Sequence, residues 1–211
     1  MSPEFQSRQL LHLDSSARIT QSDSRQLTQH FVQHWQQANP NSRVIYRDLG
    51  RNPIPHLDET WVAAYETAPV DRTPAMNQAI VLSNQLIDEL MAADCYVLGV
   101  PMYNLGIPSS LKAYIDQIVR RDRTVTFQDG LPQGALQNKK MLVVITRKFS
   151  YRPESGRADR DFQAPFLRAI FGVLGITDVM FIYADRLADP QIRQQSLIAA
   201  KQQLDQLATV W

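Results

Sequence analysis

Short apolar runs alternate along the chain with longer segments in which apolar residues recur at helical spacing. The short runs are predicted to be β-strands, and the longer segments are predicted to be amphipathic helices. The five predicted strands are residues 10–13, 43–48, 94–100, 140–146 and 178–184. The predicted helices are residues 24–38, 73–91, 108–121, 162–175 and 190–210.

Two of these strands, within residues 96–100 and 141–145, are apolar at almost every position instead of at alternate positions. Such strands are buried on both faces, as central parallel strands covered by helices are. Strands that alternate with helical crossovers favour an α/β fold with a doubly wound parallel sheet and helices on both faces. No shift in composition and no repeat marks a boundary, so we expect one domain over residues 1–211.

The composition argues against several classes of partner. With 22 basic and 21 acidic residues the formal net charge is +1, so we expect neither a nucleic acid nor an anionic membrane as partner. No apolar run approaches the roughly 20 residues of a membrane span. Residues 2–8 are mostly polar, so no signal peptide is expected and a cytoplasmic location is predicted. The single cysteine, Cys95, lies in an apolar run and is expected to be a buried, inert thiol.

The four histidines, His12, His30, His34 and His56, suggest no catalytic or metal site. His30 and His34 are four residues apart on one predicted helix, a spacing that a metal ion can use. The sequence does not identify a further ligand for them. We therefore predict no metal site and expect the histidines to lie on the surface or to be packed.

Ligands of open α/β sheets bind outside the carboxyl ends of the strands, where the strand order reverses. Residues 14–24, 101–107 and 147–161 form the three loops that follow predicted strands in this way. We expect the chemistry of the protein to lie in these loops.

The first loop is rich in hydroxyl groups and leads directly into a helix. Its hydroxyl residues are Ser15, Ser16, Thr20, Ser22 and Ser24. The free N–H groups and the dipole of a helix N-terminus bind anions, although Ser22 or Asp23 could simply cap the helix. The loop has neither the G-x-G-x-x-G pattern nor the Gly-Lys-Ser/Thr of a P-loop. It therefore favours a monophosphate such as that of FMN.

The second loop reads Pro101-Met102-Tyr103-Asn104-Leu105-Gly106-Ile107. It offers an aromatic ring for a flat ligand and an amide that can both donate and accept hydrogen bonds. An ordinary turn has the same composition, so this loop alone leaves both interpretations open.

Taken together, three motifs resemble the FMN-dependent NAD(P)H quinone and azo-compound reductases of the flavodoxin-like class. They are Leu13-Asp14-Ser15-Ser16, Ser22-Asp23-Ser24 and Val100-Pro101-Met102-Tyr103-Asn104; residues 47–49, 52–55, 110–116, 125–127 and 172–179 also fit. The resemblance implies a flavodoxin-like five-stranded sheet of order 2-1-3-4-5, FMN as cofactor and NADH or NADPH as electron donor. It also implies a homodimer with the active site at its interface. The implied reaction is two-electron reduction of quinones or azo compounds by ping-pong hydride transfer through flavin N5, with no catalytic side chain.

The resemblance also assigns residues to the site by position. The FMN phosphate would be held by Ser16, Ser22, Asp23 and Ser24. The ribityl chain and the ring would be lined by Met102, Tyr103, Asn104 and Leu105. A third wall of the site would be formed by Thr146, Arg147, Lys148 and Phe149. The aromatic candidates for the substrate pocket are Phe127, Phe149, Tyr151 and Phe162. We expect the side chain of Asp23 to point away from the phosphate and Arg18 to offset its charge.

The third wall departs from the family pattern. The segment usually reads Ser/Thr-Arg-Gly-Gly, whereas here Lys148 and Phe149 stand where the two glycines would be. Glycine permits positive φ and close backbone approach, which Phe149 does at greater cost. This favours an alternative, a non-catalytic electron carrier or regulatory module with an altered or lost flavin site. Lys148 could instead compensate with a positive charge near the reduced flavin. An esterase built on Ser15 or Ser16 is disfavoured, because no G-x-S-x-G elbow is present.

Overall fold

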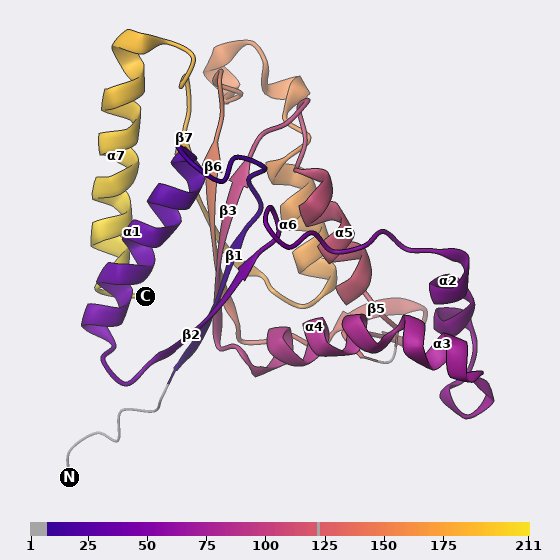
Figure 1. Cartoon of the computed structure of the whole chain (residues 1–211). Coiled ribbons are helices and arrows are strands. Elements are labelled where there is room, and N and C mark those ends of the chain that lie inside the picture. Colours follow the sequence, from indigo (N-terminus) through magenta and orange to yellow (C-terminus); the bar gives the residue numbers. More distant parts are fainter. Residues whose placement is uncertain (1–7, 122) are drawn as a thin grey trace.

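A five-stranded parallel sheet lies at the centre of the computed structural model, which describes residues 8–121 and 123–211. Its order is β2-β1-β3-β6-β7 (Figure 1). The strands are β1 (Gln9–Asp14), β2 (Arg43–Asp48), β3 (Cys95–Pro101), β6 (Lys140–Thr146) and β7 (Asp178–Ala184). Residues 2–7, which carry most of the expectation of no signal peptide, lie outside the described residues.

Helices cover both faces of this sheet (Figure 1). Helices α1 (Asp23–Ala38) and α7 (Pro190–Ala208) lie on one face. Helices α4 (Val81–Ala92), α5 (Ser109–Ile118) and α6 (Ala164–Val173) lie on the other. The predicted α/β architecture with a five-stranded parallel sheet is thereby confirmed. Within the described part of the chain, no helix combines the length and apolar character needed to cross a bilayer.

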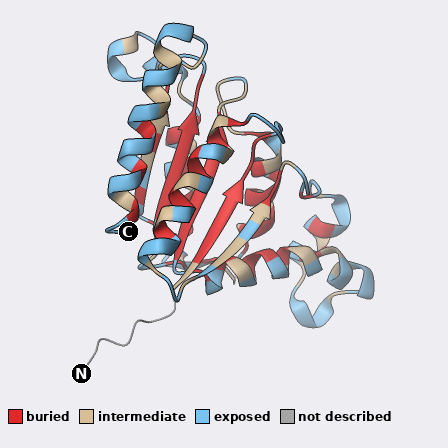
Figure 2. Cartoon of the chain, turned by 60° about the vertical axis from the view of Figure 1, so that its left-hand side comes forward, coloured by how far each residue is buried: buried red, intermediate tan, exposed pale blue. Residues whose placement is uncertain are grey.

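Successive residues of the central strands pack into two different cores. Leu98 belongs to the core beneath α4, α5 and α6, whereas its neighbour Val97 belongs to the core beneath α1 and α7. Val143 and Val144 are divided in the same way. Because helices cover both faces, every position of β3 and every position of β6 after Lys140 is buried (Figure 2), and these positions show no alternation in the sequence. Cys95 is buried as expected, and burial raises the pKa of its thiol to about 11.

The segment between β2 and β3 differs from the prediction. Helix α2 (Glu59–Glu66) was not predicted, and the single helix expected over residues 73–91 is divided into α3 (Pro74–Ala79) and α4. The division falls at Ile80, which packs with Trp61 and Ala64 of α2 in a small separate core. The helix is therefore interrupted where Ile80 packs against α2. The spacing of apolar residues along the chain does not reveal this interruption.

A hairpin outside the main sheet was also not predicted. Its strands β4 (Val125–Gln128) and β5 (Leu131–Gly134) pair antiparallel, so the fourth and fifth predicted strands are β6 and β7. Asp129 and Gly130 at its tip have φ of 52° and 78°. Positive φ at both central residues is typical of type I′ turns, for which Asp-Gly is a known signal.

The hairpin packs against the turn between α6 and β7, and the contact leaves no room for a side chain at Gly134. A Cβ there would lie 2.0 Å from the backbone carbon of Leu174. We therefore expect Gly134→Ala to lower the free energy of unfolding by about 1–3 kcal/mol, the usual cost of overpacking, as measured by urea denaturation. The control is Gly172→Ala in α6, where a Cβ has nothing within 4 Å. This control should be neutral or slightly stabilising, and equal stability of the two variants would contradict the packing described.

Candidate functional site

A cavity of about 650 Å³ opens at the carboxyl ends of β1, β3, β6 and β7. Its volume is typical of small-molecule and cofactor sites. The loops after β1 and β3 meet at the point where the strand order reverses, which is where open α/β sheets bind ligands. The loops after β1, β3 and β6 are those at which the sequence predicted the site. The loop after β7 also borders the cavity and was missed.

Most of the residues predicted to hold the cofactor line this cavity. They are Ser16, Ser22, Asp23, Met102, Tyr103, Asn104, Leu105, Thr146, Arg147, Lys148 and Phe149, and Tyr151 joins them from the predicted substrate pocket.

Three predicted residues are not among the described residues that line the cavity. Ser24 is buried behind Ser22, and the two Oγ atoms lie 3.2 Å apart. Phe162 is 62% exposed just before α6. Phe127 is 56% exposed on the hairpin, which packs on the turn that enters β7 and so lies at the opposite end of the sheet from the cavity. Neither ring therefore lines the cavity of this chain, and their place in a substrate pocket stays a prediction.

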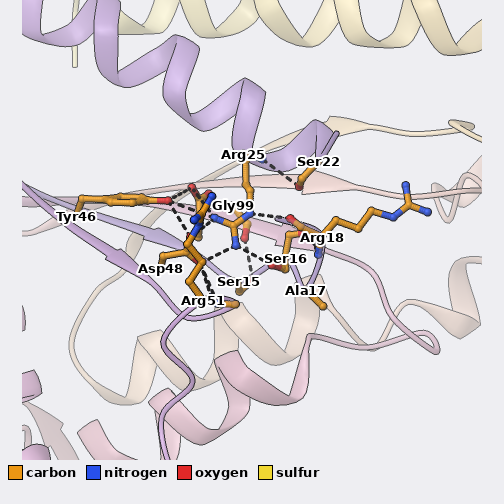
Figure 3. Close-up of polar contacts among 12 residues, drawn as sticks. Ser15, Ser16, Ala17, Arg18, Ser22, Arg25, Tyr46, Asp48, Arg51 and Gly99 are labelled. Atoms are coloured by element: carbon orange, nitrogen blue, oxygen red, sulfur yellow. Dashed lines mark hydrogen bonds and ion pairs between the residues drawn. The ribbon is translucent and has the colours of Figure 1, made fainter. Parts of the chain in front are cut away.

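Arg25, in the first turn of α1, holds the first loop in place (Figure 3). Its Nη2 donates to the carbonyl of Ser16 at 2.7 Å, and its Nε donates to the carbonyl of Arg18 at 2.9 Å. The same guanidinium donates to both carboxylate oxygens of Asp48 at 2.6 Å. One side chain thus joins the loop after β1, helix α1 and the end of β2. Arg25 was not predicted, because its partners lie on two other segments, the loop after β1 and the end of β2.

Buried acidic side chains support this arrangement. Burial alone would raise the pKa of Asp48, but hydrogen bonds from Arg25 and from the backbone N–H groups of Gly50 and Arg51 lower it overall. Burial also works to raise the pKa of Asp14, and its neighbours His12, Thr28 and Tyr46 reverse the effect. Both carboxylates are therefore held in the ionised form.

The serine hydroxyls of the first loop differ in orientation. Ser15 is buried, and its Oγ donates to the carbonyl of Gly99 at 2.8 Å, which leaves it unsuited to act as a nucleophile. Ser22 caps α1 by accepting from the backbone N–H of Arg25. Ser16 Oγ lies 3.4 Å from Tyr103 Oη, which also accepts from the backbone N–H of Ala17. The phenol of Tyr103 thereby connects the first loop to the second.

The second loop forms a tight turn that presents its side chains to the cavity. Tyr103 and Gly106 exchange backbone hydrogen bonds of 3.1 and 3.0 Å. Asn104 and Leu105 between them have φ of 48° and 69°. Positive φ is unusual and costly for leucine, and such strain concentrates at ligand sites. The loop is therefore a tight turn whose residues line the cavity, and its part in ligand binding stays a prediction.

Arg147 anchors the third loop from within the protein. Its Nη2 donates to both oxygens of Asp161 at 3.0 and 2.8 Å, and its Nε donates to Gln163 Oε1 at 3.1 Å. Gln163 in turn donates to the carbonyl of Val100 at 3.0 Å. Because Arg147 is only 2% exposed, its guanidinium serves the loop rather than the cavity.

The two missing glycines impose no backbone strain on this loop. Among the described residues, Lys148 and Phe149 are not in the positive-φ region. The part of the expected cost that came from positive φ is therefore absent at Phe149. Its ring is 50% exposed at the rim of the cavity, where the guanidinium of Arg157 lies over it.

The fourth loop completes the cavity and neutralises Asp23. Leu187 and Ala188 donate backbone hydrogen bonds to the carbonyls of Arg147 and Lys148, so the third and fourth loops are joined. Arg193, in the first turn of α7, lies 2.5 Å from Asp23 Oδ1 through its Nη2. Arg18, which was expected to offset the charge of Asp23, also lines the cavity, but the ion pair of Asp23 is with Arg193. The two members of the pair are 170 residues apart, and no local pattern could reveal the contact.

The charges around the cavity favour an anionic ligand. Arg18, Lys148 and Arg193 contribute positive charge, against the negative charge of Asp23. Arg147 is compensated by Asp161. The excess positive charge lies beside the N-terminus of α1, where the helix dipole acts in the same direction.

A doubly wound parallel sheet of order β2-β1-β3-β6-β7 with a cavity at its switch point is typical of flavodoxin-like proteins. Residues 8–208 match the family model described as a flavodoxin-like fold. The chain is 50% identical over 204 residues to FMN-dependent NADH:quinone oxidoreductase 1 of Trichormus variabilis, with 96% of each chain covered. It is 45% identical over 202 residues to the FMN-dependent NADH:quinone oxidoreductase of Nostoc punctiforme, with 96% of this chain and 98% of that protein covered.

An azoreductase from Bacillus anthracis has the same fold, with a TM-score of 0.89 at 22% identity over 97% of this chain and 100% of that one. The chain therefore belongs to the flavodoxin-like family, in the group of the FMN-dependent NADH:quinone oxidoreductases. The resemblance found in the motifs is confirmed.

The lowered pKa values of Asp14 and Asp48 predict that the fold is sensitive to acid. Each carboxylate adds stability that is complete above its unfolded pKa, near 4, and is lost as the pH falls through its lower folded pKa. We expect the free energy of unfolding to fall between about pH 5 and pH 2, and Asp48→Asn to weaken that dependence. The control is Asp129→Asn at the exposed hairpin tip. Urea denaturation at several pH values measures both, and an unchanged slope in Asp48→Asn would contradict the assignment.

Proposed function

We propose that this protein binds FMN in the cavity and uses NADH to reduce quinones or azo compounds. The observation that carries the proposal is that one cavity joins an anion site at the N-terminus of α1 to a slot formed by the second and third loops. Relatives at 45% and 50% identity, matched over 96% of the chain, are named FMN-dependent NADH:quinone oxidoreductases.

The first loop would hold the FMN phosphate. The first N–H groups of a helix have no partner within the helix, and Ser22 and Asp23 at the start of α1 line the cavity together with Ser16. Hydroxyl groups can rotate to donate to phosphate oxygens. Arg18 and Arg193 add positive charge, and Arg193 also compensates Asp23, so that the carboxylate does not repel the phosphate. Ser24 would act indirectly, by supporting Ser22.

The second and third loops would hold the rest of the cofactor. Met102, Tyr103, Asn104 and Leu105 would contact the ribityl chain and the ring, and the segment from Thr146 to Phe149 would border the polar edge of the ring. When bound, FMN supplies the centre that accepts a hydride from the donor and transfers it to the acceptor. The chain itself supplies orientation and charge. Tyr151 within the cavity and Phe149 at its rim would contact a flat donor or acceptor.

Exposed large apolar side chains outside the cavity support a homodimer. Phe127, Leu131 and Phe162 are 56%, 65% and 62% exposed. Exposed large apolar side chains are common at contact sites for another protein. A second copy seated on these residues would bury them and could bring the aromatic residues predicted for the substrate pocket to its own cavity.

The proposal predicts that the purified protein, loaded with FMN, is yellow, that NADH bleaches it and that a quinone restores the colour. In the same preparation, light scattering should give twice the 24.1 kDa of one chain. Ser16→Ala should weaken FMN binding about tenfold, the effect of one lost hydrogen bond to a charged group. The control, Ser196→Ala on α7, should bind FMN as the wild type does. A protein that cannot be loaded with FMN would overturn the proposal in favour of the non-catalytic module.

Lys148 is expected to raise the reduction potential of the bound flavin. A positive charge on the rim favours the reduced, anionic flavin, and about 1 kcal/mol of such stabilisation corresponds to roughly 20 mV for a two-electron couple. Lys148→Ala should therefore lower the midpoint potential by about that amount, as measured by redox titration. The control is Lys201→Ala on the exposed side of α7, and a Lys148→Ala potential equal to that of this control would refute the role.

A further inference from the structure

Three potential metal ligands meet on the outer side of the α1–α7 pair, outside the cavity. His30 and His34 come from α1 and Asp205 comes from α7, and one ligand atom of each lies within 4.8 Å of the others. The two helices lie side by side on the same face of the sheet (Figure 1). Asp205 is the third ligand that the sequence could not identify, because it lies 175 residues from His30.

The separations suit a metal centre. His30 Nε2 lies 2.6 Å from Asp205 Oδ1, and His34 Nε2 lies 3.8 Å from the same oxygen. In a tetrahedral site with metal–ligand bonds of about 2.0–2.1 Å, neighbouring ligand atoms are about 3.3 Å apart. The two separations lie on either side of this value, so small side-chain rotations bring the three atoms into one coordination shell. The spacing of four residues places both imidazoles on one face of α1.

The ring of His34 is already oriented for ligation. Its Nδ1 lies 2.8 Å from the backbone carbonyl oxygen of His30. A carbonyl can only accept a hydrogen bond, so Nδ1 carries the proton and Nε2 of the neutral ring has the free lone pair. Histidines that bind metals are commonly held in this way, by a hydrogen bond from the other ring nitrogen. The lone pair of His34 is on the nitrogen that lies nearer Asp205.

The exposure of the cluster leaves room for the ion and its remaining ligands. The side chains of His34 and Asp205 are 42% and 47% exposed, so water can complete the shell from solvent. Two imidazoles and one carboxylate form a donor set that suits Zn²⁺. We propose that His30, His34 and Asp205 form a surface site for Zn²⁺ or a similar divalent transition-metal ion, which clamps α1 to α7.

This site acts on the same two helices that border the cavity. At the cavity end, the ion pair of Asp23 with Arg193 already links α1 to α7. The metal links them further along, at His30 and His34. An ion that binds only the folded protein raises its stability, so bound Zn²⁺ stabilises the protein without taking part in the reaction at the cavity.

Zinc binding is tested by calorimetric titration of the untagged, full-length protein with ZnCl₂ in a buffer that does not chelate metals. An affinity tag of histidines is removed, since it would bind the ion itself. We expect one Zn²⁺ per chain with micromolar affinity, and a rise in melting temperature that EDTA reverses. In ¹⁵N spectra of the imidazole groups, zinc should shift Nε2 of His34 and leave its Nδ1 protonated.

Two histidine variants separate this site from a plain ion pair of His30 with Asp205. His34→Gln keeps that ion pair, so it should melt as the wild type does without metal but bind Zn²⁺ at least tenfold more weakly. His56→Gln removes an exposed loop histidine and should bind as the wild type does. The absence of zinc binding by the wild type, or equal affinities of the two variants, would overturn the proposal.

Discussion

The contact between Arg25 and Asp48 is the interaction on which the cavity depends most. From the first turn of α1, the guanidinium makes hydrogen bonds to the loop after β1 and to the end of β2. Both side chains are largely buried, and removal of one partner from a buried pair leaves an uncompensated charge that costs about 3–5 kcal/mol. The loop therefore has one strongly favoured path, with the hydroxyl of Ser16 and the cap residue Ser22 facing the cavity. Arginine suits this position better than lysine, because its planar fork can bind a carboxylate and carbonyl oxygens at the same time.

The loop after β6, on the other side of the cavity, is also held in place by a buried arginine. Arg147 binds Asp161 and Gln163 beneath the surface, and backbone hydrogen bonds then join its loop to the loop after β7. This explains how the third wall keeps its shape without the two glycines that the family pattern led us to expect. The loop is held from behind by a buried side chain, and Lys148 and Phe149 occupy its cavity side without positive φ. The departure in sequence therefore changes the charge and the aromatic surface at the rim, and leaves the backbone unstrained.

The proposed flavin site and the proposed metal site both lie along helices α1 and α7. Both helices begin at the cavity and run away from it along the same face of the sheet (Figure 1). The ion pair of Asp23 with Arg193 joins them near the proposed phosphate site, and the cluster of His30, His34 and Asp205 joins them further along. The proposed metal site and the proposed flavin site thus share a pair of helices and no residues. Binding of a metal ion is expected to affect flavin binding only by making the α1–α7 helix pair more rigid.

The sequence by itself determined the strands of the main sheet and the three loops that carry most of the site. Burial on both faces shows directly in unbroken apolar runs, and the loop motifs are local in sequence. The Asp129-Gly130 turn was also a local signal, although it was not used. Only the tertiary structure decided which charged groups meet. Arg25 with Asp48, Arg193 with Asp23 and Asp205 with His30 join segments brought together by the sheet order and by the packing of α1 on α7. Hydrophobic periodicity depends on neighbours three or four residues apart, whereas an ion pair depends on where the fold places residues distant in sequence.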